Sequence, residues 1–160
     1  MIFLRKIFLF PPLVGAAFLL TGCQTTESGP VTISKVNPYH FDSMRVIKTD
    51  DEMIKFEQRR HVYGAVEWEE FREKEGYYYT VFWNTKNKTP ATVQFEYCLA
   101  ATGPQVHTKE IHVSDPKRRN ATRFEVVGDE YHISGRVTQW RATVVENEVV
   151  VAEYKSFLWK

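Results

Sequence analysis

The sequence predicts an all-β fold, an antiparallel sandwich of two sheets, and three observations support this prediction. From Tyr77 onward, apolar and polar residues alternate with a period of two in several short runs, as in half-buried strands. Phe, Tyr and Trp make up 14% of the chain, and Val is frequent in its second half. Both compositions favour strands. Turn residues separate the runs, without the strand-helix alternation that builds parallel sheets.

The first half of the domain is less regular. Val31, Ile33 and Val36 are expected to lie along the domain as an edge strand, within residues 31–36. Residues 49–52, Thr-Asp-Asp-Glu, have the form of a capping box, which predicts a short helix over 50–60. Residues 61–66 are interpreted as a strand. The charged residues 67–76 are interpreted as a solvated connection with one helical turn.

The next three strands differ in polarity. Residues 77–84 are aromatic on both faces, which predicts a central strand. Residues 92–99 place Val, Phe, Tyr and Leu on one face and polar residues and Cys98 on the other, which is typical of a half-buried strand. Residues 106–113 are more polar and are expected at a sheet edge.

The last strands follow at short spacing. Residues 121–127 predict a strand, 128–130 a turn, and 134–145 a further strand. Residues 146–148 predict a tight hairpin into a final strand over 149–158.

Some six or seven such strands resemble, in architecture only, the immunoglobulin-like and fibronectin type III modules. The Cys, Trp, Cys pattern of true immunoglobulin domains is absent. A small closed barrel is the competing architecture. Trp83, Tyr97 and Trp140 are the expected core residues, because each can bridge two sheets about 10 Å apart.

The first 23 residues differ in composition from the rest of the chain. Arg5 and Lys6 precede 14 apolar or small residues over 7–20, which predicts a secretory signal peptide. The run is shorter than the ~20 residues that cross a bilayer, and two prolines interrupt it. The segment Leu20-Thr21-Gly22-Cys23 resembles the lipobox of bacterial lipoproteins.

This resemblance implies that residues 1–22 are removed and that Cys23 carries acyl chains, which are the predicted contact with membrane lipid. Residues 23–38 would then be the lipidated terminus and tether, and residues 39–160 a single sandwich domain. Gln24 follows the cysteine where Asp is the usual inner-membrane retention signal. By resemblance the outer membrane, in its periplasmic or surface-facing leaflet, is therefore favoured.

Charge and cysteine content limit the function classes. Without the two basic residues of the leader, 19 basic residues face 20 acidic ones, so no general attraction for nucleic acid or anionic lipid is expected. The run Lys117-Arg118-Arg119 is too short for a nucleic-acid patch and is interpreted as a solubilising loop. With Cys23 lipidated, Cys98 has no internal disulfide partner and is interpreted as a small strand residue.

The sequence contains no phosphate-binding glycine loop, Cys-x-x-Cys pair, His-Glu-x-x-His or Gly-x-Ser-x-Gly element. His107 and His112 are five residues apart and so lie on opposite faces of a strand, which argues against a shared metal ion. The other histidines, at 40, 61 and 132, are interpreted as structural or surface residues. The glutamates over 67–75 are interpreted as a solvated loop rather than a calcium site. No cofactor or metal is expected.

Aromatic side chains exceed what one small core needs. Tyr131, Tyr154 and Trp159 are therefore candidate exposed binding residues. The leading hypothesis is a non-enzymatic lipoprotein that binds another envelope protein. The alternatives are a carbohydrate or peptidoglycan binder that uses exposed aromatics, and a hydrolase without a recognisable motif. A contiguous apolar patch would favour the first, a row of coplanar aromatics the second, and a concave pocket with convergent titratable groups the third.

Overall fold

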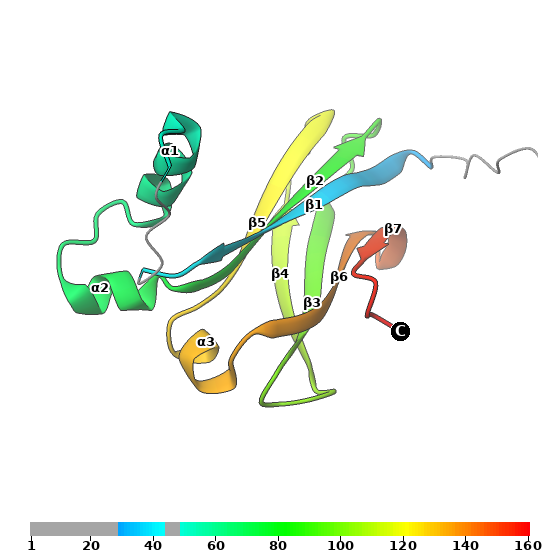
Figure 1. The fold of residues 1–160 in the computed structure, drawn as a ribbon. Coiled ribbons are helices and arrows are strands. Elements are labelled where there is room, and N and C mark those ends of the chain that lie inside the picture. Colours follow the sequence, from blue (N-terminus) through cyan, green and yellow to red (C-terminus); the bar gives the residue numbers. More distant parts are fainter. Residues whose placement is uncertain (1–28, 44–48) are drawn as a thin grey trace, which may run out of the picture.

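The computed structural model describes residues 29–43 and 49–160, which form two antiparallel sheets packed face to face (Figure 1). One sheet has the strand order β1-β2-β5 and the other β4-β3-β6-β7. The strands are β1 (Val31–Phe41), β2 (Gly76–Thr85), β3 (Ala91–Leu99), β4 (Val106–Val113), β5 (Arg119–Val127), β6 (Val137–Glu146) and β7 (Val149–Lys155).

The connections give the fold its class. The β3-β4 and β6-β7 pairs are neighbours within one sheet, whereas the chain changes sheet from β2 to β3, from β4 to β5 and from β5 to β6. This is an immunoglobulin-like sandwich. In the constant-type immunoglobulin domain the fourth strand belongs to the sheet of the first two strands. Here the fourth strand, β4, pairs with β3 in the other sheet. The prediction of an antiparallel sandwich is confirmed, and the alternative of a closed barrel is not.

The core lies between the two sheets. Trp83 and Tyr97 are buried, as predicted, with Val93, Phe95 and other inward-facing residues of β2, β3 and β6 around them. The Trp83 indole Nε1 donates to the Thr122 hydroxyl at 3.0 Å, which satisfies its only polar atom. Trp140 is half-buried and packs at the margin of this core.

Strand positions follow the polarity of the strands. β2 is central in its sheet, and β4 and β1 are edge strands, as predicted. β1 begins at Val31, which is buried, and runs to Phe41. The sheet therefore extends through the boundary that was expected between residues 38 and 39.

Three short helices accompany the sheets: α1 (Glu52–His61), α2 (Trp68–Glu73) and α3 (Asp129–Ser134). α1 confirms the helix predicted near 50–60, although its cap is Asp51, whose carboxylate accepts the Met53 N–H at 2.8 Å. The strand expected over residues 61–66 is wrong. The Val62 N–H donates to the Gln58 carbonyl at 3.4 Å and prolongs the helical turn instead of pairing with a strand.

Two other segments differ from expectation. The predicted turn after Gly128 is α3, which takes in Ser134, so that β6 begins only at Val137. β7 ends at Lys155, before the end of the strand predicted over 149–158. The Ser156 hydroxyl accepts the Trp140 N–H at 3.0 Å, while the Ser156 N–H donates to the Trp140 carbonyl.

The signal peptide, the lipobox and Cys23 lie outside the described residues. Across 29–43 and 49–160, no helix has the length and apolar character needed to span a membrane.

Candidate functional site

The long connection between β1 and β2 departs from a plain sandwich. We call residues 49–75 the helical appendage. They carry α1 and α2 and lie on the opposite side of the molecule from the point where the described chain enters β1 (Figure 1). α2 begins at a capping box formed by Glu67 and Glu70. Hydrogen bonds from the Val66 and Glu67 N–H groups lower the pKa of Glu70.

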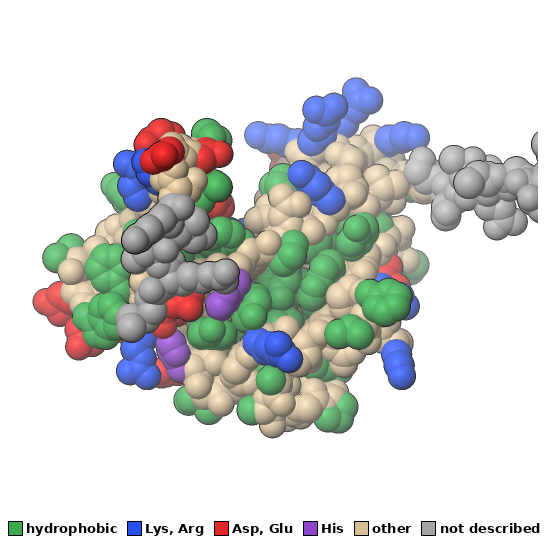
Figure 2. Space-filling view, in the orientation of Figure 1, with side chains coloured by type: hydrophobic (Ala, Val, Ile, Leu, Met, Phe, Trp, Pro, Cys, Tyr) green, Lys and Arg blue, Asp and Glu red, His purple; other side chains and the backbone are tan. Residues whose placement is uncertain are grey.

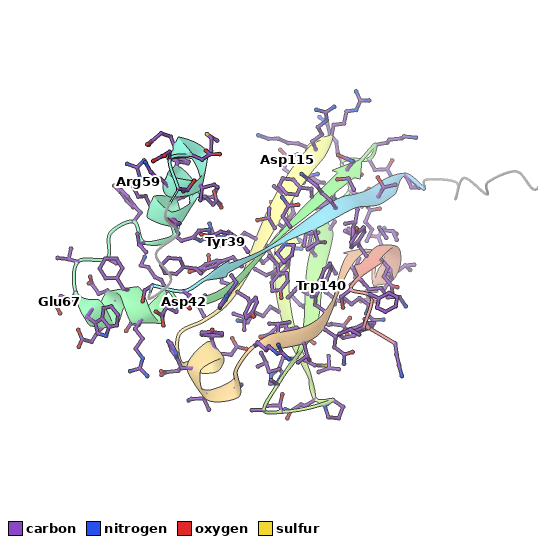
Figure 3. The ribbon with its side chains drawn as sticks, in the orientation of Figure 1. Tyr39, Asp42, Arg59, Glu67, Asp115 and Trp140 are labelled. Carbon is purple, nitrogen blue, oxygen red and sulfur yellow. The ribbon has the colours of Figure 1, made fainter. Side chains whose placement is uncertain are left out.

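The appendage is attached to the sheet through His61, the last residue of α1. The His61 ring stacks on Tyr39 of β1, with ring centroids 4.4 Å apart and planes 7° apart, and contacts the Tyr78 ring of β2 at 4.2 Å. Tyr39 lies between α1 and the sheet (Figure 3). The His61 side chain is 1% exposed.

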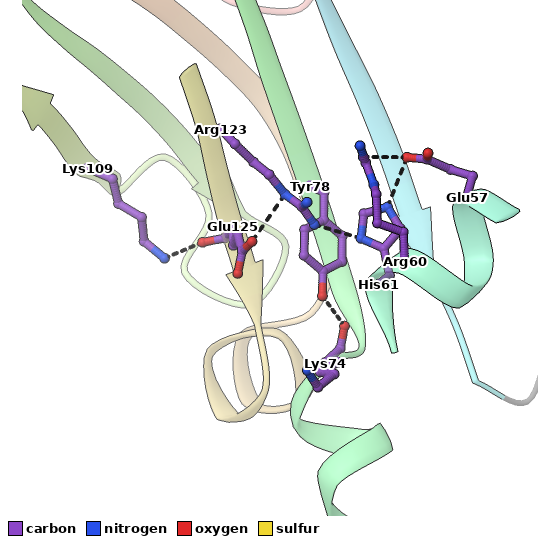
Figure 4. Close-up of polar contacts among 8 residues, drawn as sticks. All are labelled: Glu57, Arg60, His61, Lys74, Tyr78, Lys109, Arg123 and Glu125. Carbon is purple, nitrogen blue, oxygen red and sulfur yellow. Dashed lines mark hydrogen bonds and ion pairs between the residues drawn. The ribbon is translucent and has the colours of Figure 1, made fainter. Parts of the chain in front are cut away.

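Polar contacts complete this His61 cluster, which we define as Tyr39, Glu57, His61, Tyr78 and Arg123. Figure 4 shows the polar contacts of the last four residues. Arg123 of β5 donates through Nη2 to His61 Nδ1 at 2.7 Å, and the Glu57 carboxylate lies 3.2 Å from His61 Nε2. The Arg123 guanidinium also lies 4.6 Å above the Tyr78 ring and forms an ion pair with Glu125 at 3.1 Å. One helix and all three strands of the β1-β2-β5 sheet thus meet at one imidazole.

The protonation state of His61 follows from its partners. A guanidinium can only donate, so Nδ1 must accept and the ring proton resides on Nε2, facing Glu57. Burial, and then the charge of Arg123, lower the pKa of His61, while Glu57 opposes them. His61 is therefore neutral at pH 7, and both ring nitrogens are occupied within the protein. Its role is to position α1, because no ring nitrogen is left to exchange a proton with a ligand.

Burial raises the pKa of Tyr78 to about 12. Its hydroxyl donates to the Lys74 carbonyl at 2.6 Å, just after α2. The phenol therefore stays protonated and links the second half of the appendage to β2.

A cleft of about 610 Å³ opens beside the His61 cluster, between α1 and the outer face of the β1-β2-β5 sheet. Its lining mixes apolar rings with polar groups: Asn37, Pro38, Tyr39, Glu57, Arg60, His61, Tyr78, Thr80, Phe82 and Ala121. The space-filling view shows the hollow between the appendage and the sandwich (Figure 2). The charged groups in the lining are already paired, since Arg60 contacts Glu57 at 2.7 Å.

The appendage also exposes large apolar side chains. Six of the exposed large hydrophobic residues on the described chain fall within sixteen positions: Met53, Ile54, Phe56, Tyr63, Val66 and Trp68. Met53 and Phe56 are three residues apart and share one face of α1. Tyr63 and Val66 are more than four-fifths exposed. This apolar group was not predicted from the sequence, because residues 61–66 were assigned to a strand and sequence alone does not show which side chains of α1 stay exposed.

The three aromatic residues proposed from sequence do not form one platform. The Tyr131 hydroxyl lies 2.9 Å from His40 Nε2, and its ring is half-buried in α3. Tyr154 of β7 is exposed and stacks on Trp140, with planes 10° apart. Trp159 is half-buried beneath the guanidinium of Arg141, which lies 5.1 Å from its ring centroid.

Trp140 and Arg141 are consecutive in β6 and point to opposite faces, so Tyr154 and Trp159 lie on different faces of the sheet. Near the C-terminus, the fully exposed aromatic residue is Phe157. These positions do not make the row of coplanar rings that stacking on a glycan requires.

Several of the remaining histidines and glutamates have local partners. His107 stacks on Tyr97 and His112 contacts Thr92, so the two lie on opposite faces of β4, as expected. Glu75 accepts hydrogen bonds from the Ser43 N–H and hydroxyl. Within the described ranges, no three His, Cys, Asp or Glu side chains are grouped to hold a metal ion.

Comparison with known proteins yields one structural likeness. No protein-family model matches the chain, and no curated protein matches it significantly. An immunoglobulin-like protein from Pseudomonas aeruginosa, solved as a crystal structure, aligns over 81% of this chain and 96% of its own, with 15% identity and a TM-score of 0.39.

Proposed function

We propose that this protein is a lipid-anchored component of the bacterial envelope and binds another envelope protein through its helical appendage. The anchor is proposed from Leu20-Thr21-Gly22-Cys23 and the leader before it. Acyl chains on Cys23 would hold the protein on the membrane, because each buried methylene contributes about 0.8 kcal/mol. The outer membrane is the proposed location, on the basis of Gln24.

The observation that carries the binding role is the exposed apolar group on the appendage. Exposed apolar patches on a monomer surface mark interaction sites. Met53, Tyr63 and Trp68, which lie within sixteen positions of the chain, are each more than half exposed. Trp and Tyr are also the residue types that most often dominate binding energy at protein interfaces. No enzymatic role is proposed, since the histidine beside the cleft has both nitrogens occupied.

The charge of the appendage indicates the chemistry of the partner. Residues 50–75 contain nine acidic and five basic residues. Glu52 and Glu57 form ion pairs with neighbouring basic residues on α1, whereas Glu69 is exposed with no ion pair to any described residue. The partner should therefore present an apolar surface with basic residues at its rim.

Copurification of the full chain from detergent-solubilised envelopes tests this proposal. The test variant replaces Met53, Phe56 and Trp68 with Ser. The matched control replaces Val149, Phe157 and Leu158, which are equally apolar and exposed on the described chain, with Ser. We expect one stoichiometric protein to copurify with wild type and with the control at high salt, and to be lost with the appendage variant.

Equal loss in both variants, or equal retention, would contradict the appendage as the binding surface. Recovery of glycan alone would favour the carbohydrate-binding alternative. A Cys23→Ala variant tests the anchor separately, because it should lose both palmitate labelling and membrane fractionation. Membrane fractionation that survives this change would refute the lipobox assignment.

A further inference from the structure

Basic side chains collect at one end of the sandwich. Residues 86–90 and 114–119, which are two loops and the first residue of β5, form what we call the basic end. They carry Lys86, Lys88, Lys117, Arg118 and Arg119. All five side chains are exposed. Within the described part of the chain, none of them forms an ion pair. Figure 2 shows basic residues gathered at the top of the molecule, near the entering chain.

Acidic residues offset this charge only partly. Asp115 is the acid within the two loops and lies at the same end of the molecule (Figure 3). Glu148 is exposed in the neighbouring β6-β7 turn, and Glu146 is buried. Counting the exposed groups, five positive charges face two negative ones. The near-neutral net charge of the chain therefore conceals a separation of charge between this end and the acidic appendage.

The described chain enters the fold at this same end. The Lys86 N–H donates to the Pro30 carbonyl at 2.9 Å, and the Thr85 N–H donates to the Arg118 carbonyl at 3.2 Å. Gly29 and Pro30 line a hollow of about 240 Å³ together with Lys86, Arg118 and Arg119. Both basic loops thus lie beside the first residues of β1.

The length of the preceding chain limits the distance from the anchor. Seven residues separate Cys23 from Val31, and at ~3.3 to 3.6 Å each they span at most about 25 Å. β1 has 11 residues and, at ~3.3 Å each, carries the chain about 36 Å further before the appendage begins. With an anchor at Cys23, the basic end would therefore be the part of the domain that lies closest to the lipid.

We propose that the basic end docks on the anionic headgroups of the bilayer that holds the anchor, so that the appendage is presented away from the membrane. This inference rests on the proposed lipidation of Cys23. Membrane-bound anionic phosphate groups complement the unpaired Lys and Arg side chains, and the tether keeps them at high effective concentration. Each Lys or Arg near such a surface contributes roughly fivefold to the partition between the docked and free states.

Energy transfer in vesicles tests this orientation. The full lipidated protein carries a dye either at Asn87→Cys, in the basic end, or at Gln105→Cys, in the exposed loop at the opposite end of the sandwich. Vesicles contain a headgroup-labelled acceptor in phosphatidylcholine, with or without phosphatidylglycerol. We expect transfer to be stronger from position 87 than from 105, and the difference to require phosphatidylglycerol and to shrink between 0.05 and 0.5 M salt.

Matched substitutions sharpen the test. Replacing Lys86, Lys88 and Lys117 with Gln should lower the ratio of docked to free protein on the order of 100-fold and equalise the two transfer efficiencies. The control replaces Arg136, Lys155 and Lys160, three exposed basic residues outside the basic end, and should leave the difference intact.

The possible failures are distinguishable. Protein that does not float with vesicles at all would refute the anchor and the docking together. Protein that floats but shows equal transfer from both dyes, whatever the lipid, would refute docking while leaving the anchor in place. An equal response to the two triple variants would show a general charge effect and would also overturn the basic end as a docking surface.

Discussion

Replacing His61 should release the helical appendage without unfolding the sandwich. In His61→Phe a ring remains between Tyr39 and Tyr78, but Arg123 loses the acceptor that lies 2.7 Å away. A hydrogen bond to a charged group is worth about 1.5 to 3 kcal/mol. Because Arg123 keeps its contact with Glu125, we expect a loss of about 2 kcal/mol.

His61→Ala should cost more, because it also removes two ring contacts of about 0.5 to 1.5 kcal/mol each. The total is about 4 kcal/mol. A helix of ten residues is marginal in water without tertiary contacts, so α1 should melt once it is released. The sandwich core, formed by other residues, should persist.

Hydrogen exchange read by mass spectrometry measures this directly. Amide protection in α1 should fall about 30-fold in His61→Phe, while protection in β3 and β6 stays within twofold of wild type. The control is His112→Ala, because His112 is exposed on β4 and should leave α1 unchanged. Exchange of α1 within threefold of wild type in both His61 variants would refute the His61 cluster as the attachment of the appendage.

Three further results are expected. The pKa of His61 is lowered in the folded protein, so the state in which α1 is released binds the proton more readily. The amide protection of α1, corrected for intrinsic exchange rates, should therefore decline as pH falls below about 6.5. His61→Phe should abolish this decline. Phe95→Ala should lower the free energy of unfolding in urea by about 3 to 5 kcal/mol, because Phe95 is fully buried, whereas Phe157→Ala should change it by less than about 0.5 kcal/mol. Gly76→Ala should cost more than about 3 kcal/mol or prevent folding, because an added Cβ would lie 2.2 Å from the Val126 carbonyl oxygen.

Each result has a contrary outcome. A pH response of α1 that persists in His61→Phe would assign the titration to another group. Similar losses for the two phenylalanines would contradict the assignment of the core. Gly64 also has positive φ but nothing within 4 Å of an added Cβ. A Gly64→Ala variant as damaging as Gly76→Ala would show that backbone strain, rather than contact with β5, causes the effect.

The strands were predictable where the alternation of apolar and polar residues in the sequence shows which side chains are buried. In β3, Val93, Phe95 and Tyr97 point into the core, and their alternation with polar residues is visible in the sequence. β2 was recognisable as central because Tyr78 and Phe82 make its outer face apolar as well.

The helices were harder to predict, because short helices depend on local caps and tertiary contacts. The segment after His61 contains Val62, Tyr63 and Val66, which favour strands by composition. In the structure it pairs with no strand among the described residues, and the contacts of His61 with the sheet hold it in place. Tertiary contacts thus override propensity at this position.

The His61 cluster and the basic end both depend on residues that are distant in the sequence. The His61 cluster joins positions from 39 to 123, and the basic end joins Lys86 and Lys88 to a run at 117–119. Viewed alone, that run was too short to indicate a binding patch. Only the register of β2 against β5 places the two loops together, with Asn84 opposite Arg119.

The measurement that tests the binding role most directly is site-specific photo-crosslinking in intact cells. A photoreactive phenylalanine analogue replaces Phe56 on the appendage or, as the control, Phe157 near the C-terminus, both of which are exposed. The proposed function predicts one dominant protein adduct from position 56 and none of that size from position 157. The same adduct from both positions, or no protein adduct from position 56, would contradict the appendage as the binding surface.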